Sequence, residues 1–252
     1  MNELQIHNWL VLLMFAFAAQ TFMLLLWVNA PYGRFVRPGW GPTMSTRTAW
    51  ILLESPAVII FAAVYLVGDH ALATVPLVLF GIWQFHYIIR TFVFPLRIRE
   101  TGKRIPIFIV AMAILFNCLN AYLNARWISH LGDYELSWLI SVPFIAGALC
   151  FATGWLINQH ADLILFRLRK SGESDYKIPH GGMYRWVSCP NYLGEMLMWI
   201  GWAIATWSLA GAAFAVFTIA NLLPRAFAIH RWYQSEFADY PQSRHVVLPF
   251  VL

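Results

Sequence analysis

Long apolar runs alternate with short polar segments along most of the chain. Seven runs approach the length of about 20 residues that a helix needs to cross a bilayer. We expect their helices at residues 9–29, 49–68, 74–94, 105–124, 137–158, 191–207 and 209–228. The last two runs are separated only by Ser208 and its neighbours, which predicts a tight helical hairpin. The pattern therefore predicts an all-α integral membrane protein with seven transmembrane helices.

The basic residues fall almost entirely on one side of this seven-helix arrangement. Fifteen of the 17 lysines and arginines follow the first, third or fifth run or lie in the C-terminal stretch that begins at Arg225. Cytoplasmic loops carry such an excess of positive charge, so we expect the N-terminus outside and the C-terminus in the cytoplasm. The first eight residues carry only one charged side chain, Glu3, which favours a retained span over a cleaved signal peptide.

Composition agrees with a membrane protein and excludes an ordinary soluble globule. The chain is 60% hydrophobic and only 12% charged, whereas soluble domains carry about 25% charged residues. The net charge of +5 follows from the predicted orientation and from attraction to anionic lipid headgroups, so it indicates no nucleic-acid partner. Nothing in the sequence indicates an obligate protein partner. A bacterial inner membrane and an endoplasmic reticulum membrane both suit this pattern.

Several ionisable and amide side chains lie within the predicted spans, where they are costly unless they face a cavity or a partner. One interpretation is structural, with a salt bridge between Glu54 and Arg90. The other is a polar cavity open to the cytoplasm, whose aromatic walls would suit a flat apolar ligand. Helical spacing places these residues on three stripes, which are Trp50 and Glu54; Trp83, Tyr87, Arg90 and Phe94; and Asn191, Glu195 and Trp199.

Familiar cofactor and metal motifs do not occur. The sequence has no G-x-G-x-x-G segment after a strand and no Walker loop. It also lacks the clustered histidines of a di-iron membrane desaturase, and its histidines and cysteines show no metal-ligand spacing. We therefore expect no metal site.

Residues 158–252 resemble the C-terminal part of the steroid 5α-reductases (3-oxo-5α-steroid 4-dehydrogenases). The resemblance is carried by NQHADLILFRLRKSGESDYKIPHGGMYRWVSCPNYLGEMLMWIGWAIATWSL, PRAFAIHRWY and FADYPQSRHVVLPF. Two earlier segments also match, namely the pair Trp50 and Glu54 and the stretch HYIIRTFVFP at residues 86–95. One position departs from the family, because Leu53 stands where a glutamine commonly precedes the membrane glutamate.

The resemblance implies seven helices, NADPH as cofactor and reduction of the 4,5 double bond of 3-oxo-4-ene steroids. Residues 1–125 would then supply the carbonyl-polarising pair Tyr87 and Glu54, and residues 126–252 would form the cofactor-binding half. Trp50 and Trp199 would line the steroid slot. The cofactor contacts would be Asn158, Asp162, Arg169, Tyr176, Asn191, Glu195, Arg225 and Tyr233, with Arg99 and Lys103 added from the basic loop after the third run.

This chemistry makes specific demands on the residues. A hydride must reach the β-carbon of the enone, and the carbonyl oxygen must be stabilised as it becomes an enolate. A tyrosine hydroxyl is a suitable donor. Glu54 in apolar surroundings could stay protonated and also donate, whereas Arg90 would favour its ionised form. Arg169 and Lys170 are candidates to hold the 2′-phosphate that distinguishes NADPH from NADH.

Three alternatives remain open. A trans-2-enoyl-CoA reductase performs the same chemistry on another substrate. Membrane methyltransferases of the isoprenylcysteine or phospholipid type share a helix opening similar to CPNYLGE, but they usually have fewer spans and an arginine–histidine pair where this chain has Ser188 and Cys189. A non-enzymatic lipid-binding protein would leave the C-terminal polar residues unexplained.

Overall fold

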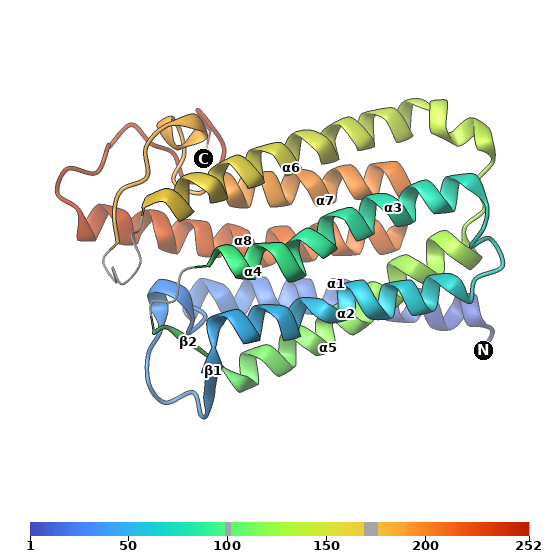
Figure 1. Cartoon of the computed structure of the whole chain (residues 1–252), viewed down its shortest axis with the longest axis horizontal. Coiled ribbons are helices and arrows are strands. Elements are labelled where there is room, and N and C mark those ends of the chain that lie inside the picture. The colour runs from blue at the N-terminus through green and yellow to red at the C-terminus, as the bar shows by residue number, and fades with distance from the viewer. Residues whose placement is uncertain (99–101, 169–175, 252) are drawn as a thin grey trace. The chain divides into compact units, whose positions relative to one another are not determined.

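The structure, a computed structural model, describes residues 1–98, 102–168 and 176–251. It is built from α-helices, with one small two-stranded sheet (Figure 1). The helices are α1 (Glu3–Trp27), α2 (Thr46–Leu66), α3 (Thr74–Ile88), α4 (Phe94–Arg97), α5 (Ile107–Arg126), α6 (Val142–Leu168), α7 (Pro190–Thr206) and α8 (Leu209–Glu236). The shorter elements are the π-helices η2 (Ile89–Val93) and η3 (Trp127–Leu131), the 3-10 helices η1 (Gly33–Phe35), η4 (Leu136–Ile140) and η5 (Gly182–Arg185), and the strands β1 (Thr43–Ser45) and β2 (Arg104–Pro106).

Six helical segments within the described ranges are long and apolar enough to cross a membrane. They are Glu3–Trp27, Thr46–Leu66, Thr74–Arg97, Ile107–Leu131, Val142–Leu168 and Leu209–Glu236. The prediction of an all-α, multi-pass membrane protein is therefore confirmed. The helix expected at 191–207 forms as α7, which has 17 residues and is shorter than these six.

Two helices continue well beyond the ends of the apolar runs. α6 was expected to end at residue 158 but reaches Leu168, and α8 was expected to end at residue 228 but reaches Glu236. Polar and charged residues are compatible with a helix, so a hydropathy boundary marks the apolar core and not the helix end. As a consequence, Asp162 and Tyr233 lie inside helices.

The chain contacts divide the structure into two compact units. The first unit comprises residues 1–13 and 30–144, and the second comprises residues 14–29 and 145–252. Within the first unit, α2 and α5 pack along their length. The antiparallel pairing of β1 with β2, with Met44 opposite Ile105, joins them at one end. At the other end, a Cβ on Gly68 would lie 2.3 Å from the carbonyl oxygen of Ser129, so this close approach requires glycine.

An aromatic core fixes α3 against α2. Trp83 is fully buried, stacks on Phe61 with ring centroids 4.4 Å apart, and donates from Nε1 to the carbonyl of Ala57 at 2.8 Å. α3 then passes directly into the π-helix η2 and into α4. Such single-turn π-helices change the direction in which the following side chains point. The stripe from Trp83 to Phe94 is thus interrupted between Tyr87 and Phe94.

In the second unit, α6 and α7 are antiparallel and meet at paired glycines. A Cβ on Gly154 would lie 2.5 Å from the carbonyl oxygen of Gly194, and one on Gly201 would lie 2.6 Å from that of Gly147. The predicted hairpin between α7 and α8 is present. Its turn places Trp207 in the left-handed conformation, with φ of 45°, and Ser208 Oγ accepts from the backbone N–H of Gly211 at 2.9 Å.

Candidate functional site

In the first unit, Glu54 and Arg90 form an ion pair enclosed by aromatic rings. Arg90 Nε lies 3.5 Å from Glu54 Oε1, and both side chains are largely buried. The Arg90 guanidinium lies over the rings of Trp50 and Phe94, 4.6 and 4.5 Å from their centroids. The two rings contact each other edge to face, with centroids 5.2 Å apart. A cation held by two aromatic rings and a carboxylate is fixed in position. We call these four residues, together with Tyr87, the Glu54–Arg90 group.

Tyr87 is also buried inside the first unit. Its ring packs against Trp83 at 4.8 Å and against the edge of His86 at 5.0 Å, and only 3% of the residue is exposed. The ring is therefore held by packing, which leaves the hydroxyl as the part of the side chain that can act chemically. The sequence placed Trp50, Glu54, Tyr87 and Arg90 on helix faces, and the structure places them in one unit.

In the second unit, amide and carboxylate side chains of α6 and α7 form a hydrogen-bonded network. Asn158 Nδ2 donates to the backbone carbonyl of Asn191 at 3.0 Å and to Glu195 Oε2 at 3.1 Å. Asn191 Nδ2 donates to Asp162 Oδ1 at 3.3 Å. Trp199 Nε1 donates to Glu195 Oε1 at 3.0 Å. Five predicted site residues thus come together in what we call the amide–carboxylate network.

The glycine pairs of α6 and α7 make this network possible. A Cβ on Gly194 would lie 2.5 Å from the backbone nitrogen of Asn158, so the two backbones touch at that point. Asn158 is consequently close enough to reach both a main-chain carbonyl and the Glu195 side chain of α7.

The remaining predicted cofactor residues occupy other places or lie outside the described ranges. The Arg225 guanidinium lies 5.7 Å from the ring centroid of Tyr192. Tyr176 packs on Trp232 at 5.0 Å, and Trp232 in turn contacts Tyr233 at 5.1 Å. The predicted residues Arg99 and Arg169, with Lys170, lie outside the residues that the structure describes.

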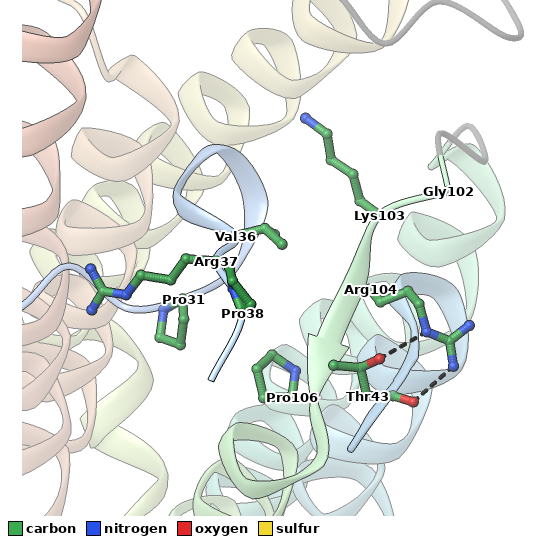
Figure 2. Close-up of a pocket in the computed structure, with 9 residues that line it drawn as sticks. All are labelled: Pro31, Val36, Arg37, Pro38, Thr43, Gly102, Lys103, Arg104 and Pro106. Atoms are coloured by element: carbon green, nitrogen blue, oxygen red, sulfur yellow. Dashed lines mark hydrogen bonds between the residues drawn. The ribbon is translucent and has the colours of Figure 1, made fainter. Parts of the chain in front are cut away.

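Lys103 lines an open cavity of about 430 Å³ in the first unit (Figure 2). Arg104 donates from Nε and Nη2 to the side chain and backbone of Thr43 at 2.9 and 2.8 Å, which ties the wall together. The nine lining residues include three cations and no acidic side chain; they are Pro31, Val36, Arg37, Pro38, Thr43, Gly102, Lys103, Arg104 and Pro106. The lining is mainly apolar, and the charged ends of Arg37, Lys103 and Arg104 point in different directions (Figure 2). Sequence reasoning missed Arg37 and Arg104 because the pairing of β1 with β2, which joins the two loops, has no hydropathy signal.

A second polar cluster, also missed, fixes the C-terminal tail of the second unit to the start of α7. Ser188 Oγ lies 2.6 Å from both His230 Nδ1 and the Tyr240 hydroxyl. Arg244 lies over the Tyr240 ring at 5.2 Å. Burial raises the pKa of the Tyr240 hydroxyl, although hydrogen bonds with Ser188 and Arg244 oppose this effect. The cluster holds the loop that leads into Asn191 and Glu195.

Comparison with known proteins decides the family. The model of the family described as 3-oxo-5-alpha-steroid 4-dehydrogenase matches residues 103–252. A steroid 5-alpha-reductase DET2 of Gossypium hirsutum is 43% identical over 99% of both chains. The chain belongs to the steroid 5-alpha-reductase family. Its DET2 relative in Arabidopsis thaliana is 44% identical over 92% of this chain and 91% of that protein. A 3-oxo-5-alpha-steroid 4-dehydrogenase 1 of Rattus norvegicus is 41% identical over 89% of this chain and 87% of the relative.

Membership of the steroid 5-alpha-reductase family confirms the predicted resemblance and the predicted class of enzyme, an oxidoreductase. It implies a nicotinamide cofactor, which agrees with the donors and acceptors found in the two units. The similarity to the Gossypium hirsutum relative covers the N-terminal residues as well, so it includes both the Glu54–Arg90 group and the amide–carboxylate network.

Proposed function

We propose that the protein uses NADPH to reduce the 4,5 double bond of 3-oxo-4-ene steroids within a membrane. Family membership over nearly the whole chain carries this proposal. The name of the Rattus norvegicus relative specifies a 3-oxo-5-alpha-steroid and a dehydrogenase acting at position 4. We assign residues 1–125 to polarisation of the carbonyl and residues 126–252 to cofactor binding.

Tyr87 and Glu54 are proposed to polarise the C3 carbonyl. As a hydride arrives at C5, negative charge develops on the carbonyl oxygen, and the resulting enolate is completed by a proton at C4. A hydroxyl held rigidly in a dry, aromatic environment stabilises that oxygen more strongly than water does. The ring packing of Tyr87 on Trp83 supports this role, because it leaves only the hydroxyl to be oriented. Glu54 either donates as a neutral acid or, as a carboxylate, holds Arg90.

The residues present fit a nicotinamide dinucleotide. Amide and carboxylate groups such as those of Asn158, Asp162, Asn191 and Glu195 bind ribose hydroxyls and a carboxamide by hydrogen bonds. Lys103 is proposed to contact phosphate oxygens, for which a lysine ammonium group is a suitable donor. When bound, the cofactor supplies the hydride. The chain's own residues bind it, orient it and exclude water.

The preference for NADPH over NADH is proposed to depend on basic side chains, since only NADPH carries a 2′-phosphate. Arg169→Ala should raise KM for NADPH much more than KM for NADH. Lys103→Ala provides the parallel test for the cavity of the first unit. Equal changes with both cofactors would move the phosphate site away from the residue tested.

The activity itself is tested with detergent-purified protein, NADPH and either testosterone or progesterone. The expected result is the 5α-reduced steroid, formed with stoichiometric oxidation of NADPH. Tyr87→Phe serves as the matched variant with reduced turnover. Reduction of a trans-2-enoyl-CoA in place of the steroids would identify the enoyl-CoA reductase alternative, and no reduction of either would overturn the proposal.

We also propose seven transmembrane helices, with the N-terminus outside and the cofactor-binding loops in the cytoplasm. α7 is the proposed seventh span, since a helix of 17 residues lies at the short end of the range that crosses a bilayer. The positive charges of the loops support this orientation. A steroid substrate that partitions into lipid would reach such a protein from the membrane.

A further inference from the structure

Side-chain donors converge on the backbone of α2 on both sides of Glu54. Asn117 of α5 donates from Nδ2 to the carbonyl of Leu53 at 2.6 Å. On the other side, α3 supplies Trp83, which donates to Ala57 at 2.8 Å, and Gln84, which donates to the carbonyl of Val58 at 3.1 Å. The segment that carries Glu54 is therefore braced by two neighbouring helices.

This bracing coincides with a weak point in the helix. Pro56 lies inside α2 and has no backbone N–H, so the regular hydrogen bonding of the helix is interrupted at that position. Proline positions are where helices bend, and the bend angle depends on the surrounding contacts. The Asn117 bond acts on the residue directly before Glu54, within one turn of the proline.

The hydrogen bond of the Asn117 side chain links α5 to α2 and is not part of the hydrogen bonding within α5. The residue is 7% exposed, and its amide donates to another helix. Asn124, two turns later, provides a contrast on the same helix. It is equally polar and 1% exposed, but its Nδ2 bonds the carbonyl and side-chain oxygens of Asn120, within α5. A buried amide costs free energy unless it is paired. The Asn117 amide bonds across to α2, and the Asn124 amide bonds within α5.

We propose that Asn117 is a positioning residue for the reaction, which fixes the direction of Glu54 by holding the carbonyl of Leu53. This inference rests on the proposed function. Arg90 Nε lies 3.5 Å from the Glu54 carboxylate, a distance that a small rotation of α2 at Pro56 would change. Trp83 lies one turn before Tyr87 on α3. Its hydrogen bond to Ala57 therefore fixes the position of Tyr87 relative to α2, the helix that carries Glu54. Asn117 thereby helps to set the spacing of Glu54 and Tyr87.

The test compares Asn117→Leu with Asn124→Leu, two nearly isosteric changes at buried positions of one helix. Asn117→Leu should lower kcat by about tenfold, because a small misplacement of a catalytic group has effects of this order or larger. KM for NADPH, and the cofactor Kd measured by nicotinamide fluorescence, should stay within about twofold. Asn124→Leu should lower Tm by about as much as Asn117→Leu does, but it should leave kcat unchanged. Asn117→Gln retains a donor and should recover part of the lost kcat.

A double-mutant cycle with Glu54→Gln separates positioning from general destabilisation. If Asn117 acts through Glu54, then Asn117→Leu should have little further effect on the residual kcat of Glu54→Gln. Additive losses, or equal losses of kcat in the Asn117 and Asn124 variants of an active enzyme, would overturn the inference alone. A folded wild-type protein that reduces no steroid would overturn the proposed function and this inference together.

Discussion

At the scale of single residues, the first unit pairs a fixed charge with a fixed hydroxyl. Arg90 lies against two aromatic rings and pairs with Glu54, and Tyr87 is held by its ring. The residue types and their helical spacing were predictable from the sequence, because a stripe at intervals of three and four residues is visible there. The pairing of Glu54 with Arg90 was also one of the two interpretations of the sequence, and the structure contains it. The π-helix between Tyr87 and Phe94 was not predictable, because it leaves no mark in a hydropathy pattern.

Tyr87→Phe should lower kcat by about 10²–10³-fold, by analogy with the removal of one oxyanion donor. The change deletes only the hydroxyl, so the ring contacts with Trp83 and His86 should persist. Because the hydroxyl binds the transition state more strongly than the ground state, the loss should appear in kcat and not in NADPH binding. Near-normal turnover, with normal protein yield, would remove Tyr87 from the catalytic role.

The two possible roles of Glu54 predict different patterns of variants. If Glu54 is a neutral donor, Glu54→Gln should keep partial activity, because an amide can still donate, and Glu54→Ala should not. If its charge holds Arg90, both variants should lose activity to the same degree. The ion pair with Arg90 favours the second pattern. Steady-state kcat of the two variants, compared at equal protein yield, discriminates between the roles.

At the scale of elements, the close packing of α6 on α7 brings the side chains of the amide–carboxylate network within hydrogen-bonding distance. The apolar runs predicted where helices form, but α6 and α8 extend through polar residues, which the runs could not indicate. The glycines of α6 and α7 are visible in the sequence as small residues. Their pairing is not, because it depends on which helix faces which.

Gly194→Ala should destabilise the protein by about 1–3 kcal/mol, the usual effect of overpacking, since the new methyl group would meet the backbone of Asn158. It should also weaken NADPH binding, because Asn158 would move away from Glu195. Gly81→Ala is the matched control, since a Cβ there meets nothing within 4 Å. Tm and cofactor Kd are the measurements, and equal effects at the two glycines would contradict this account.

Tyr240 predicts a decline of stability at alkaline pH. A tyrosine in the unfolded chain loses its proton near pH 10, whereas burial raises the pKa of folded Tyr240. Above about pH 10 the folded state therefore binds more protons than the unfolded state, and stability falls as pH rises. Tyr240→Phe should be less stable at pH 8 but should show a shallower fall of Tm between pH 9 and 11. Parallel curves for the two proteins would rule out this contribution.

At the scale of the whole molecule, the charge pattern predicts one orientation in the membrane. The small sheet of β1 and β2 and the C-terminal tail cluster were not predictable, because both depend on contacts between segments far apart in the sequence. The number of long apolar helices was predictable within one, since the short α7 lies at the limit of what crosses a bilayer.

Reporter fusions test the proposed orientation. A reporter after Leu252 should be cytoplasmic, and one inserted at residues 69–73 should be external. The two fusions together test the number of spans between them, because each helix that fails to cross would reverse the side of every later loop. A cytoplasmic signal at both positions would contradict the seven-span arrangement.

The paired glycines of α6 and α7 also bear on how these helices find their partners during assembly. Gly147 and Gly154 are seven residues apart on one helix, and Gly194 and Gly201 have the same separation on the other. If the helices slid past each other by two turns, only one pair of glycines would still face each other, and the second close approach would be lost. Such a shift would also leave the amide of Asn158 without its two acceptors on α7, where lipid offers no replacement. The same side chains that are proposed to bind the cofactor therefore discriminate against a shifted pairing of the two helices before any cofactor is bound.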